Sequence, residues 1–269
     1  MVSGRDGGPL KVSVLAAPFA MSPEKAYVPV LIEIDGASLL AGSKTGTATT
    51  EVYVYALDAT GTVRDYFTQN LGLDLAKVGD TVRAGGVKFF GDLELPPGSY
   101  ALRVLVRNGD TGASGLRALA LDVPTFTDGK PVLLPAFQPA PNDRWLMARE
   151  TNIHEGDLPF PFMMRGKAFV PASRPTLQAG QEVALALIGY RLAEGTLSAR
   201  ATILSADGKE VGEGSLRILG RETAAGGVVR FAAAFRPPKL APGDYVLLLT
   251  LTDANGGAET SATPFALGG

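Results

Sequence analysis

The stretch that decides the fold occurs twice, as LELPPGSYALRVLVRN at residues 93–108 and as PKLAPGDYVLLLTLTD at residues 238–253. Both copies contain Leu-x-Pro-Gly-x-Tyr followed by apolar residues at alternate positions. The alternating residues are Leu102, Val104 and Val106 in the first copy and Leu247, Leu249 and Leu251 in the second. Because successive side chains of a strand point to opposite faces, this period of two predicts a half-buried β-strand after each tyrosine.

The Pro-Gly pair before each tyrosine predicts a tight corner, since Pro fixes φ and Gly permits a positive φ. A tyrosine directly after such a corner is typical of the tyrosine corner of immunoglobulin-like sandwiches, in which the hydroxyl bonds back to the main chain. We therefore expect Tyr100 and Tyr245 to form structural tyrosine corners. The alternative is a tyrosine at the end of a strand with no such bond.

Further matched segments lie upstream of the two strands, in the same order in both halves. Residues 29–34 match 182–187, residues 55–61 match 203–208, and residues 84–87 match 225–228. Turn residues between β-rich runs in these segments indicate hairpins. No helical period extends beyond about two turns, and residues 71–78, the only candidate, are weakened by Gly72 and Gly79.

The sequence therefore predicts an all-β protein of two tandem immunoglobulin-like or fibronectin-III-like β-sandwich domains, each of about seven strands. We expect β-sandwich domain 1 at residues 10–123, a Pro- and aromatic-rich connecting region at 124–168, and β-sandwich domain 2 at 169–269. Residues 1–9 are expected to be a disordered tail or an addition made for expression. Their loop-like character suggests a fragment of a larger protein cut at a linker.

The connecting region differs from both sandwiches because it combines seven prolines with many aromatic and methionine residues. Aromatic side chains bury large apolar areas, which argues against a flexible linker. One interpretation is that the region bridges the sandwiches and adds an edge strand at residues 144–150. The sharper hypothesis is an exposed binding surface formed by Trp145, Phe160, Phe162 and Met163.

Composition excludes several classes of protein. Lys plus Arg number 25 and Asp plus Glu number 27, giving a net charge of −2, whereas binding to nucleic-acid phosphates needs a basic surplus. The absence of cysteine excludes a disulfide scaffold. No run of about 18 apolar residues occurs, so we expect no membrane span. Arg64, Arg103, Arg107 and Arg117 could form a basic face on the first domain, although a solvated sheet face is the expected meaning.

Catalytic and metal-binding motifs are missing from the sequence. One histidine and no cysteine exclude the usual zinc ligand sets, while calcium binding by Asp-containing loops is left open. His154 lies in a polar loop beside Gly156, and no G-x-S-x-G elbow occurs. Two acids for glycoside hydrolysis are not excluded by spacing, but most acids lie at turns. We expect no catalytic, cofactor-binding or metal-binding residue, and no cofactor.

The repeated segments resemble the C-terminal region of bacterial VWFA-related proteins of the Acidobacteria type, in which a von Willebrand factor type A domain precedes sandwich-like modules. The resemblance rests on VPVLIE at 28–33, LPPGSYALRV at 95–104, GASG at 112–115, LPFPF at 158–162 and FVPA at 169–172. It implies a secreted or periplasmic setting and a non-catalytic role. The D-x-S-x-S metal-adhesion motif of the type A domain is absent, so metal-dependent adhesion is not carried over to any residue.

The leading expectation is a non-enzymatic, extracytoplasmic scaffold or protein-interaction module that belongs to a larger VWFA-related protein. Its partner would be a protein of unidentified type, and nucleic acid is not expected. The alternative is a carbohydrate- or small-ligand-binding module that uses the aromatic residues of the connecting region. A third hypothesis, a hydrolase with a pair of carboxylates, requires a cleft in which two acids lie about 5–10 Å apart.

Overall fold

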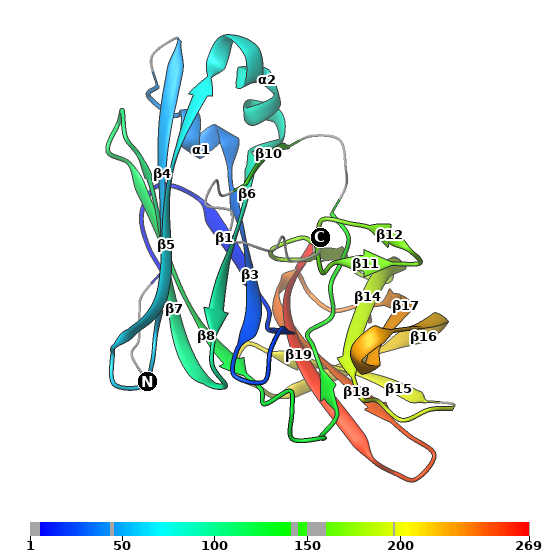
Figure 1. Cartoon of the computed structure of the whole chain (residues 1–269). Coiled ribbons are helices and arrows are strands. Elements are labelled where there is room, and N and C mark those ends of the chain that lie inside the picture. The colour runs from blue at the N-terminus through cyan, green and yellow to red at the C-terminus, as the bar shows by residue number, and fades with distance from the viewer. Residues whose placement is uncertain (1–5, 44–45, 141–144, 150–159, 196, 269) are drawn as a thin grey trace. The chain divides into compact units, whose positions relative to one another are not determined.

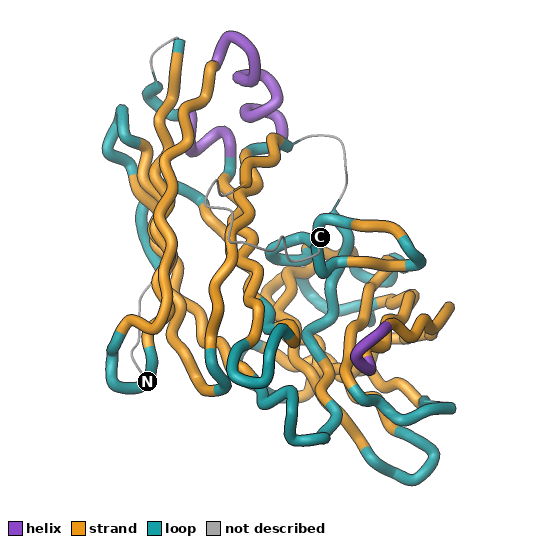
Figure 2. Tube along the Cα trace, in the orientation of Figure 1, coloured by secondary structure: helices purple, strands orange, loops and turns teal. Residues whose placement is uncertain are grey.

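The computed structural model describes residues 6–43, 46–140, 145–149, 160–195 and 197–268. The chain forms two compact units, coloured along the sequence in Figure 1. Unit 1 comprises Met1–Thr125 and Pro141–Leu158, and unit 2 comprises Phe126–Ala140 and Pro159–Gly269. Strands dominate both units (Figure 2), so the predicted all-β sandwich fold is confirmed.

Unit 1 is built from two sheets. The first has the order β1-β3-β6-β10 with β2 paired to β3, where the bounds are β1 Val12–Ala16, β2 Phe19–Ala20, β3 Ala26–Ile34, β6 Val87–Leu95 and β10 Leu146–Arg149. The second has the order β5-β4-β7-β8, where the bounds are β5 Val63–Asp74, β4 Thr47–Leu57, β7 Gly98–Asn108 and β8 Ser114–Val123. β10 pairs with β6 in parallel, whereas the other strand pairs of these two sheets are antiparallel.

Two helices, α1 (Gly36–Leu40) and α2 (Leu75–Gly85), join strands of unit 1. The Asp74 carboxylate caps α2 by accepting a hydrogen bond from the backbone N–H of Ala76 at 3.1 Å. Gly86 ends it at a φ of 79° and donates its N–H to the carbonyl oxygen of Val82 at 2.7 Å. The expected limit of two helical turns is wrong here, because α2 has 11 residues, about three turns. Caps at both ends supply the stability that its glycines remove.

The apolar residues that alternate after Tyr100 lie in the core of unit 1. Leu102, Val104 and Val106 of β7 are each 0% exposed, while the residues between them lie on the opposite face. Full burial of such a side chain stabilises a fold by about 1.5–3 kcal/mol. A shift of one residue in the strand pairing would expose all three side chains to water. Their burial therefore fixes the register of the sheet.

Unit 2 contains eight strands paired in the order β13-β19-β18-β15-β16-β17-β14-β9. Their bounds are β9 Val132–Leu133, β13 Thr176–Gln178, β14 Val183–Tyr190, β15 Ser198–Ser205, β16 Glu210–Ala224, β17 Val228–Arg236, β18 Gly243–Thr252 and β19 Ala258–Gly268. Residues 210–214 of β16 pair with β15, and residues 215–224 pair with β17. A strand that passes from one sheet to the other makes a corner between two packed sheets. Unit 2 also holds a hairpin of β11 (Met163–Met164) and β12 (Lys167–Ala168), and the 3-10 turn η1 (Ala225–Gly227).

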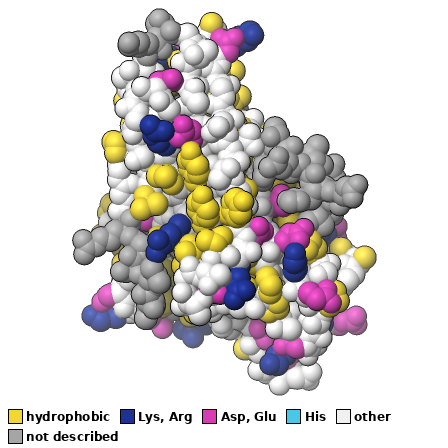
Figure 3. Space-filling model, turned by 60° about the vertical axis from the view of Figure 1, so that its left-hand side comes forward, with side chains coloured by type: hydrophobic (Ala, Val, Ile, Leu, Met, Phe, Trp, Pro, Cys, Tyr) yellow, Lys and Arg dark blue, Asp and Glu magenta, His cyan; other side chains and the backbone are white. Residues whose placement is uncertain are grey.

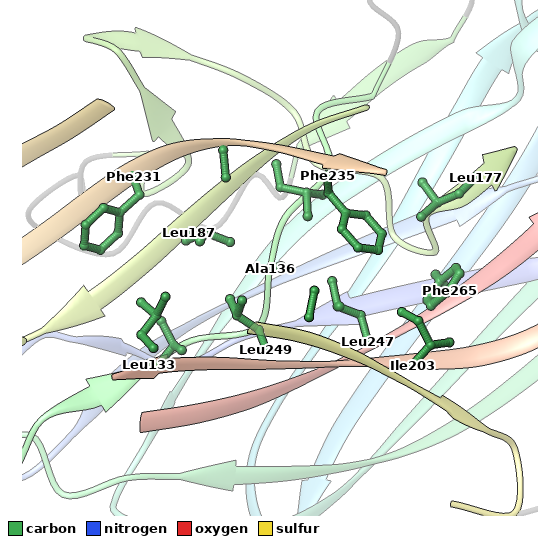
Figure 4. Close-up of a cluster of buried hydrophobic side chains, with 14 of the residues drawn as sticks. Leu133, Ala136, Leu177, Leu187, Ile203, Phe231, Phe235, Leu247, Leu249 and Phe265 are labelled. Carbon is green, nitrogen blue, oxygen red and sulfur yellow. The ribbon is translucent and has the colours of Figure 1, made fainter. Parts of the chain in front are cut away.

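The core of unit 2 is formed by apolar side chains from both of these sheets (Figure 4). The labelled residues include Leu187, Phe231 and Phe235 of β14 and β17, and Ile203, Leu247 and Leu249 of β15 and β18. The alternation predicted after Tyr245 is therefore present, since Leu247, Leu249 and Leu251 are at most 3% exposed.

The two sandwiches share one strand order. Unit 1 contains β3-β6 and β5-β4-β7-β8, and unit 2 contains the corresponding β14-β17 and β16-β15-β18-β19. The matched sequence segments fall on corresponding elements: residues 29–34 lie in β3 and residues 183–187 in β14, and residues 84–87 and 225–228 lead into β6 and β17. The sequence repeat is thus also a repeat of topology.

β10 takes, in unit 1, the place that the end of β16 takes in unit 2. Leu146–Arg149 pairs with Val87–Phe90 of β6, and Arg221–Ala224 pairs with Val228–Phe231 of β17. Val87 and Val228 are equivalent in the sequence repeat. Helix α2 stands between β5 and β6, whereas the short η1 stands between β16 and β17. β5 pairs with β4 and does not extend to β6, unlike β16, which also pairs with β17. The free edge of β6 therefore pairs with β10, a strand from a later part of the chain.

The expected connecting region is divided between the two units rather than being a separate element. β9 pairs with β14 in unit 2, β10 pairs with β6 in unit 1, and β11 again belongs to unit 2. The expected edge strand at residues 144–150 is present as β10. Each sandwich therefore includes strands from residues 124–168, which were expected to belong to neither domain.

The described part of the expected tail is attached to β8. Gly7 and Leu116 exchange two backbone hydrogen bonds, at 3.1 and 2.8 Å, and the Asp6 carboxylate accepts the N–H of Ala118 at 3.0 Å. The expectation of a disordered tail is wrong for these residues. β8 is the last strand of its sheet, and the unpaired backbone groups of such an edge readily accept another segment.

Candidate functional site

Both repeated tyrosines make the hydrogen bond of a tyrosine corner. The Tyr100 hydroxyl donates to the carbonyl oxygen of Pro96 at 2.8 Å, and the Tyr245 hydroxyl donates to that of Ala241, also at 2.8 Å. Each bond spans the turn at the start of its strand. Burial raises the pKa of Tyr100, as expected for a hydroxyl withdrawn from water. These contacts are internal, so the two tyrosines support the fold rather than a ligand.

The residues expected to form a binding surface are divided between the two units. Trp145 belongs to unit 1, whereas Phe160, Phe162 and Met163 belong to unit 2. Phe162 is 1% exposed and packs edge-on against Phe137, with ring centroids 5.1 Å apart. The expectation of a binding role is wrong for Phe162, because its ring is part of the interior of unit 2.

The other three residues of the expected surface are half-buried. The Phe160 ring lies 5.5 Å from that of Phe162, and Met163 begins β11. In unit 1, the Lys88 ammonium lies 5.4 Å from the ring centre of Trp145, which is cation–π geometry. Packing within each unit accounts for these contacts.

The outer face of the sheet β5-β4-β7-β8 carries aromatic residues that the sequence analysis did not single out. Tyr53 and Tyr55 of β4 point away from the core, because the residues that alternate with them are fully buried. Tyr55 lies opposite Tyr66 of β5, with ring centroids 5.7 Å apart and ring planes at 16°. Tyr66 is 60% exposed, more than any other large hydrophobic side chain that the structure describes.

Residues of β7 and β8 extend this face across the sheet. Arg103 lies opposite Tyr55, and Leu105 lies between Tyr53 and Leu116. We call the six outward residues the tyrosine face: Tyr53, Tyr55, Tyr66, Arg103, Leu105 and Leu116. Figure 3 shows hydrophobic side chains gathered on this side of the molecule, beside a few charged ones. A solvated sheet face is normally polar, so this composition sets the face apart.

Positive charge on the tyrosine face is concentrated at Arg103. The other three arginines of the expected basic face each have an acidic partner: Arg107 with Glu51 at 3.0 Å, Arg64 with Asp58 at 2.6 Å, and Arg117 with Asp6 at 3.8 Å. No ion pair or hydrogen bond of the Arg103 guanidinium occurs among the described residues. Its five N–H donors therefore remain for a partner.

Tyr53 is kept neutral at the rim of the face. Its hydroxyl lies 3.2 Å from the Glu51 carboxylate, to which it donates a hydrogen bond. Desolvation and the Glu51 charge raise the pKa of Tyr53. The sequence signal for this face is the spacing of two residues between Tyr53 and Tyr55, which places both rings on one face of a strand.

The described residues hold no group of three or more His, Asp or Glu that could bind a metal ion. His154, the only imidazole of the sequence, lies outside the described residues.

Within the described segments, no helix is both long enough and apolar enough to span a membrane.

No protein-family model matches the sequence, and no curated protein matches it. Among solved structures, the chain is similar to fibronectin(III)-like modules of Clostridium thermocellum CbhA, with 12% identity and a TM-score of 0.23 over 96% of this chain and 94% of that one. It is similar to a calcium-binding mutant of Bacteroides uniformis beta-glucuronidase 2, with 13% identity and a TM-score of 0.29 over 45% of this chain. It is also similar to dimeric latent PorU from Porphyromonas gingivalis, with 10% identity and a TM-score of 0.26 over 97% of this chain.

The chain spans 13% of the glucuronidase and 24% of PorU. The class of the protein follows from its own strand pairing and cores. That class is a tandem β-sandwich protein.

Proposed function

We propose that the protein is a non-catalytic, extracytoplasmic interaction module that binds another protein through the tyrosine face. The observation that carries the proposal is the exposed Tyr66 ring on a sheet face whose arginine, Arg103, has no acidic partner among the described residues. The secreted or periplasmic setting, and the place of the chain in a larger VWFA-related protein, are supported by the sequence resemblance alone.

The composition of the tyrosine face supports a protein interface. Tyrosine and arginine are enriched in interfaces and account for many of the residues that dominate binding energy. A tyrosine ring offers a large rigid contact area with few rotatable bonds, so little conformational entropy is lost on binding. The Arg107–Glu51 ion pair lies at the border of the face, where interfaces are typically polar.

Arg103 favours a partner that carries a carboxylate. A guanidinium group binds a carboxylate through two parallel hydrogen bonds, and it is more weakly hydrated than an ammonium group. Leu105 and Leu116 beside it offer apolar area that the hydroxyl groups of a sugar chain do not match. A protein surface with an acidic residue among apolar ones therefore fits this face better than a glycan.

Site-specific photo-crosslinking tests the proposal on the full chain. A photoreactive phenylalanine analogue replaces Tyr66, and the protein is mixed with secreted and periplasmic proteins of its source organism. The matched control carries the analogue at Val211, which is 39% exposed on β16 of unit 2. We expect a discrete crosslinked protein from position 66 that is absent from position 211 and is lost with Arg103→Ala. Identical products from both positions would reject the proposal.

Carbohydrate binding is the competing function for the same face, because sugar rings stack on tyrosine rings. The full chain, Tyr66→Ala and Val211→Ala are compared on a glycan array. Binding that is retained by Val211→Ala and lost by Tyr66→Ala would replace the protein-binding proposal with a carbohydrate-binding one.

A further inference from the structure

Unit 2 contains a pocket of about 170 Å³ whose wall comes from the β11–β12 turn and from strands β16 and β17. The lining residues are Met164, Arg165, Gly220, Arg221, Glu222, Arg230, Phe231 and Ala232. A cavity of about 150 Å³ is sufficient to hold a benzene molecule. The pocket therefore has room for a ligand of about one ring.

Arg230 lines this pocket and carries an unused hydrogen-bond donor. Its Nε is shielded from solvent and has no hydrogen-bond partner among the described residues. Glu222 lies opposite Arg230 in the β16–β17 ladder, yet no ion pair between them is present. Buried donors are nearly always paired in folded proteins, so an orphaned donor on a residue that lines the pocket points to an acceptor that binds beside it.

Arg165 lines the pocket from a turn in which arginine is an unusual residue. The turn between β11 and β12 consists of Arg165 and Gly166, at φ values of 51° and 69°. Two successive positive φ angles are typical of a type I′ hairpin turn, whose first position favours Asn or Gly. An arginine side chain is strained there, because its Cβ approaches the following carbonyl oxygen. An exposed cation therefore lines the pocket at a turn position that Asn or Gly would adopt with less strain.

Arg221 and Phe231 complete the lining, and the Phe231 ring itself belongs to the core of unit 2. The Arg221 guanidinium lies 5.6 Å from the ring centroid of Phe231, and it donates to the carbonyl oxygens of Ala193 at 2.9 Å and Gly195 at 2.8 Å. Those carbonyl groups position Arg221 without neutralising it. Three arginines thus line the pocket against one acidic residue, Glu222.

From these features we infer that the pocket binds a small organic carboxylate with an apolar, ring-sized body. The carboxylate accepts hydrogen bonds from Arg230 and Arg165, and the body lies against Met164 and Ala232. Guanidinium groups match the two oxygens of a carboxylate. The apolar part of the lining favours an organic acid over an inorganic anion. This site lies in unit 2 and is independent of the tyrosine face in unit 1.

Titration of the full chain with three probes tests the inference, read out by calorimetry and by chemical shifts. The probes are benzoate, its uncharged analogue benzamide, and inorganic phosphate. We expect saturable benzoate binding, with benzamide weaker by about tenfold or more, because charge-assisted hydrogen bonds are lost. Equal binding of benzoate and benzamide, or an absence of saturation with benzoate, would overturn the inference. Tighter binding of phosphate than of benzoate would overturn its assignment to an organic acid.

Substitutions that each remove one charge locate the site. Arg165→Gln should weaken benzoate binding about tenfold, whereas Lys167→Gln, the same charge change at an exposed residue of the same hairpin, should leave it unchanged. Glu222→Gln should tighten binding because it removes a repelling carboxylate. Equal weakening by Arg165→Gln and Lys167→Gln would contradict a specific site. Arg165 and Glu222 are exposed, so these variants test binding without disturbing the core.

Discussion

The Tyr100 hydroxyl bonds to the carbonyl oxygen of Pro96, four residues upstream, at 2.8 Å. The equivalent bond in unit 2 joins Tyr245 to Ala241 at the same distance. We predict that Tyr100→Phe and Tyr245→Phe each lower the free energy of unfolding by about 0.5–1.5 kcal/mol, the net value of one hydrogen bond. Tyr100→Phe should have the larger effect, since Tyr100 is 8% exposed and its hydrogen bond is partly buried, whereas that of Tyr245 is exposed.

Denaturant unfolding measures this effect. Tyr66→Phe is the matched control, because Tyr66 is exposed and its hydroxyl has no hydrogen bond among the described residues. If all three variants unfold at the wild-type midpoint, the tyrosines do not support their corners.

Asp58 organises the turn between β4 and β5. Its carboxylate accepts hydrogen bonds from the Thr60 hydroxyl at 2.6 Å, from the backbone N–H groups of Thr60 and Thr62 at 2.9 and 3.0 Å, and from Arg64 Nε at 2.6 Å. These bonds, first among them that of the Thr60 hydroxyl, hold the pKa of Asp58 well below its ordinary value of about 3.9. A lowered pKa stabilises the fold above the ordinary value, and this stability is lost as the pH falls below it.

Asp58→Asn should therefore lower the melting temperature at pH 7. The difference from wild type should stay constant down to about pH 5 and shrink as the pH falls below about 4. Asp80→Asn serves as the control, because that carboxylate is fully exposed and has only an (i,i+3) pair with Arg83. A difference that is independent of pH would show that Asp58 acts through its shape rather than through its charge.

Trp145, the only tryptophan, reports on β10. Successive residues of a strand direct their N–H groups to opposite sides, so replacing both Met147 and Ala148 by proline removes a donor that faces β6. We predict that this double variant releases β10 and shifts the emission of Trp145 to longer wavelength. Met147→Ala, which keeps the backbone donors, should leave the emission unchanged. An unchanged spectrum for the double proline variant would contradict the pairing of β10 with β6.

Short-range patterns predicted the strands around the two tyrosine corners. Leu102 and Leu247 stand in runs whose period of two and Pro-Gly corner are visible within about ten residues, and both lie in a core. The pairing of Leu146–Arg149 with β6 was not predictable in the same way. Four residues are too few to show a period. Their partner strand, β6, lies more than fifty residues earlier in the sequence, and its edge is available because α2 separates β5 from β6.

The tyrosine face was missed because its strand carries apolar residues on both sides. Val52 and Val54 alternate with Tyr53 and Tyr55, so the pattern of β4 has no polar face to mark the outside. Packing against the second sheet decides which set is buried. The hypothesis for Phe162 failed for a related reason, since exposed and buried aromatic residues look alike in sequence.

The affinity of the full chain for the protein captured through position 66 tests the central claim most directly. We predict that Tyr66→Ala and Arg103→Ala each weaken binding by about tenfold or more, as expected for residues at the centre of an interface. Val211→Ala, which removes an exposed hydrophobic side chain from unit 2, should bind like wild type. Wild-type affinity in both Tyr66→Ala and Arg103→Ala would contradict the assignment of the tyrosine face as the binding surface.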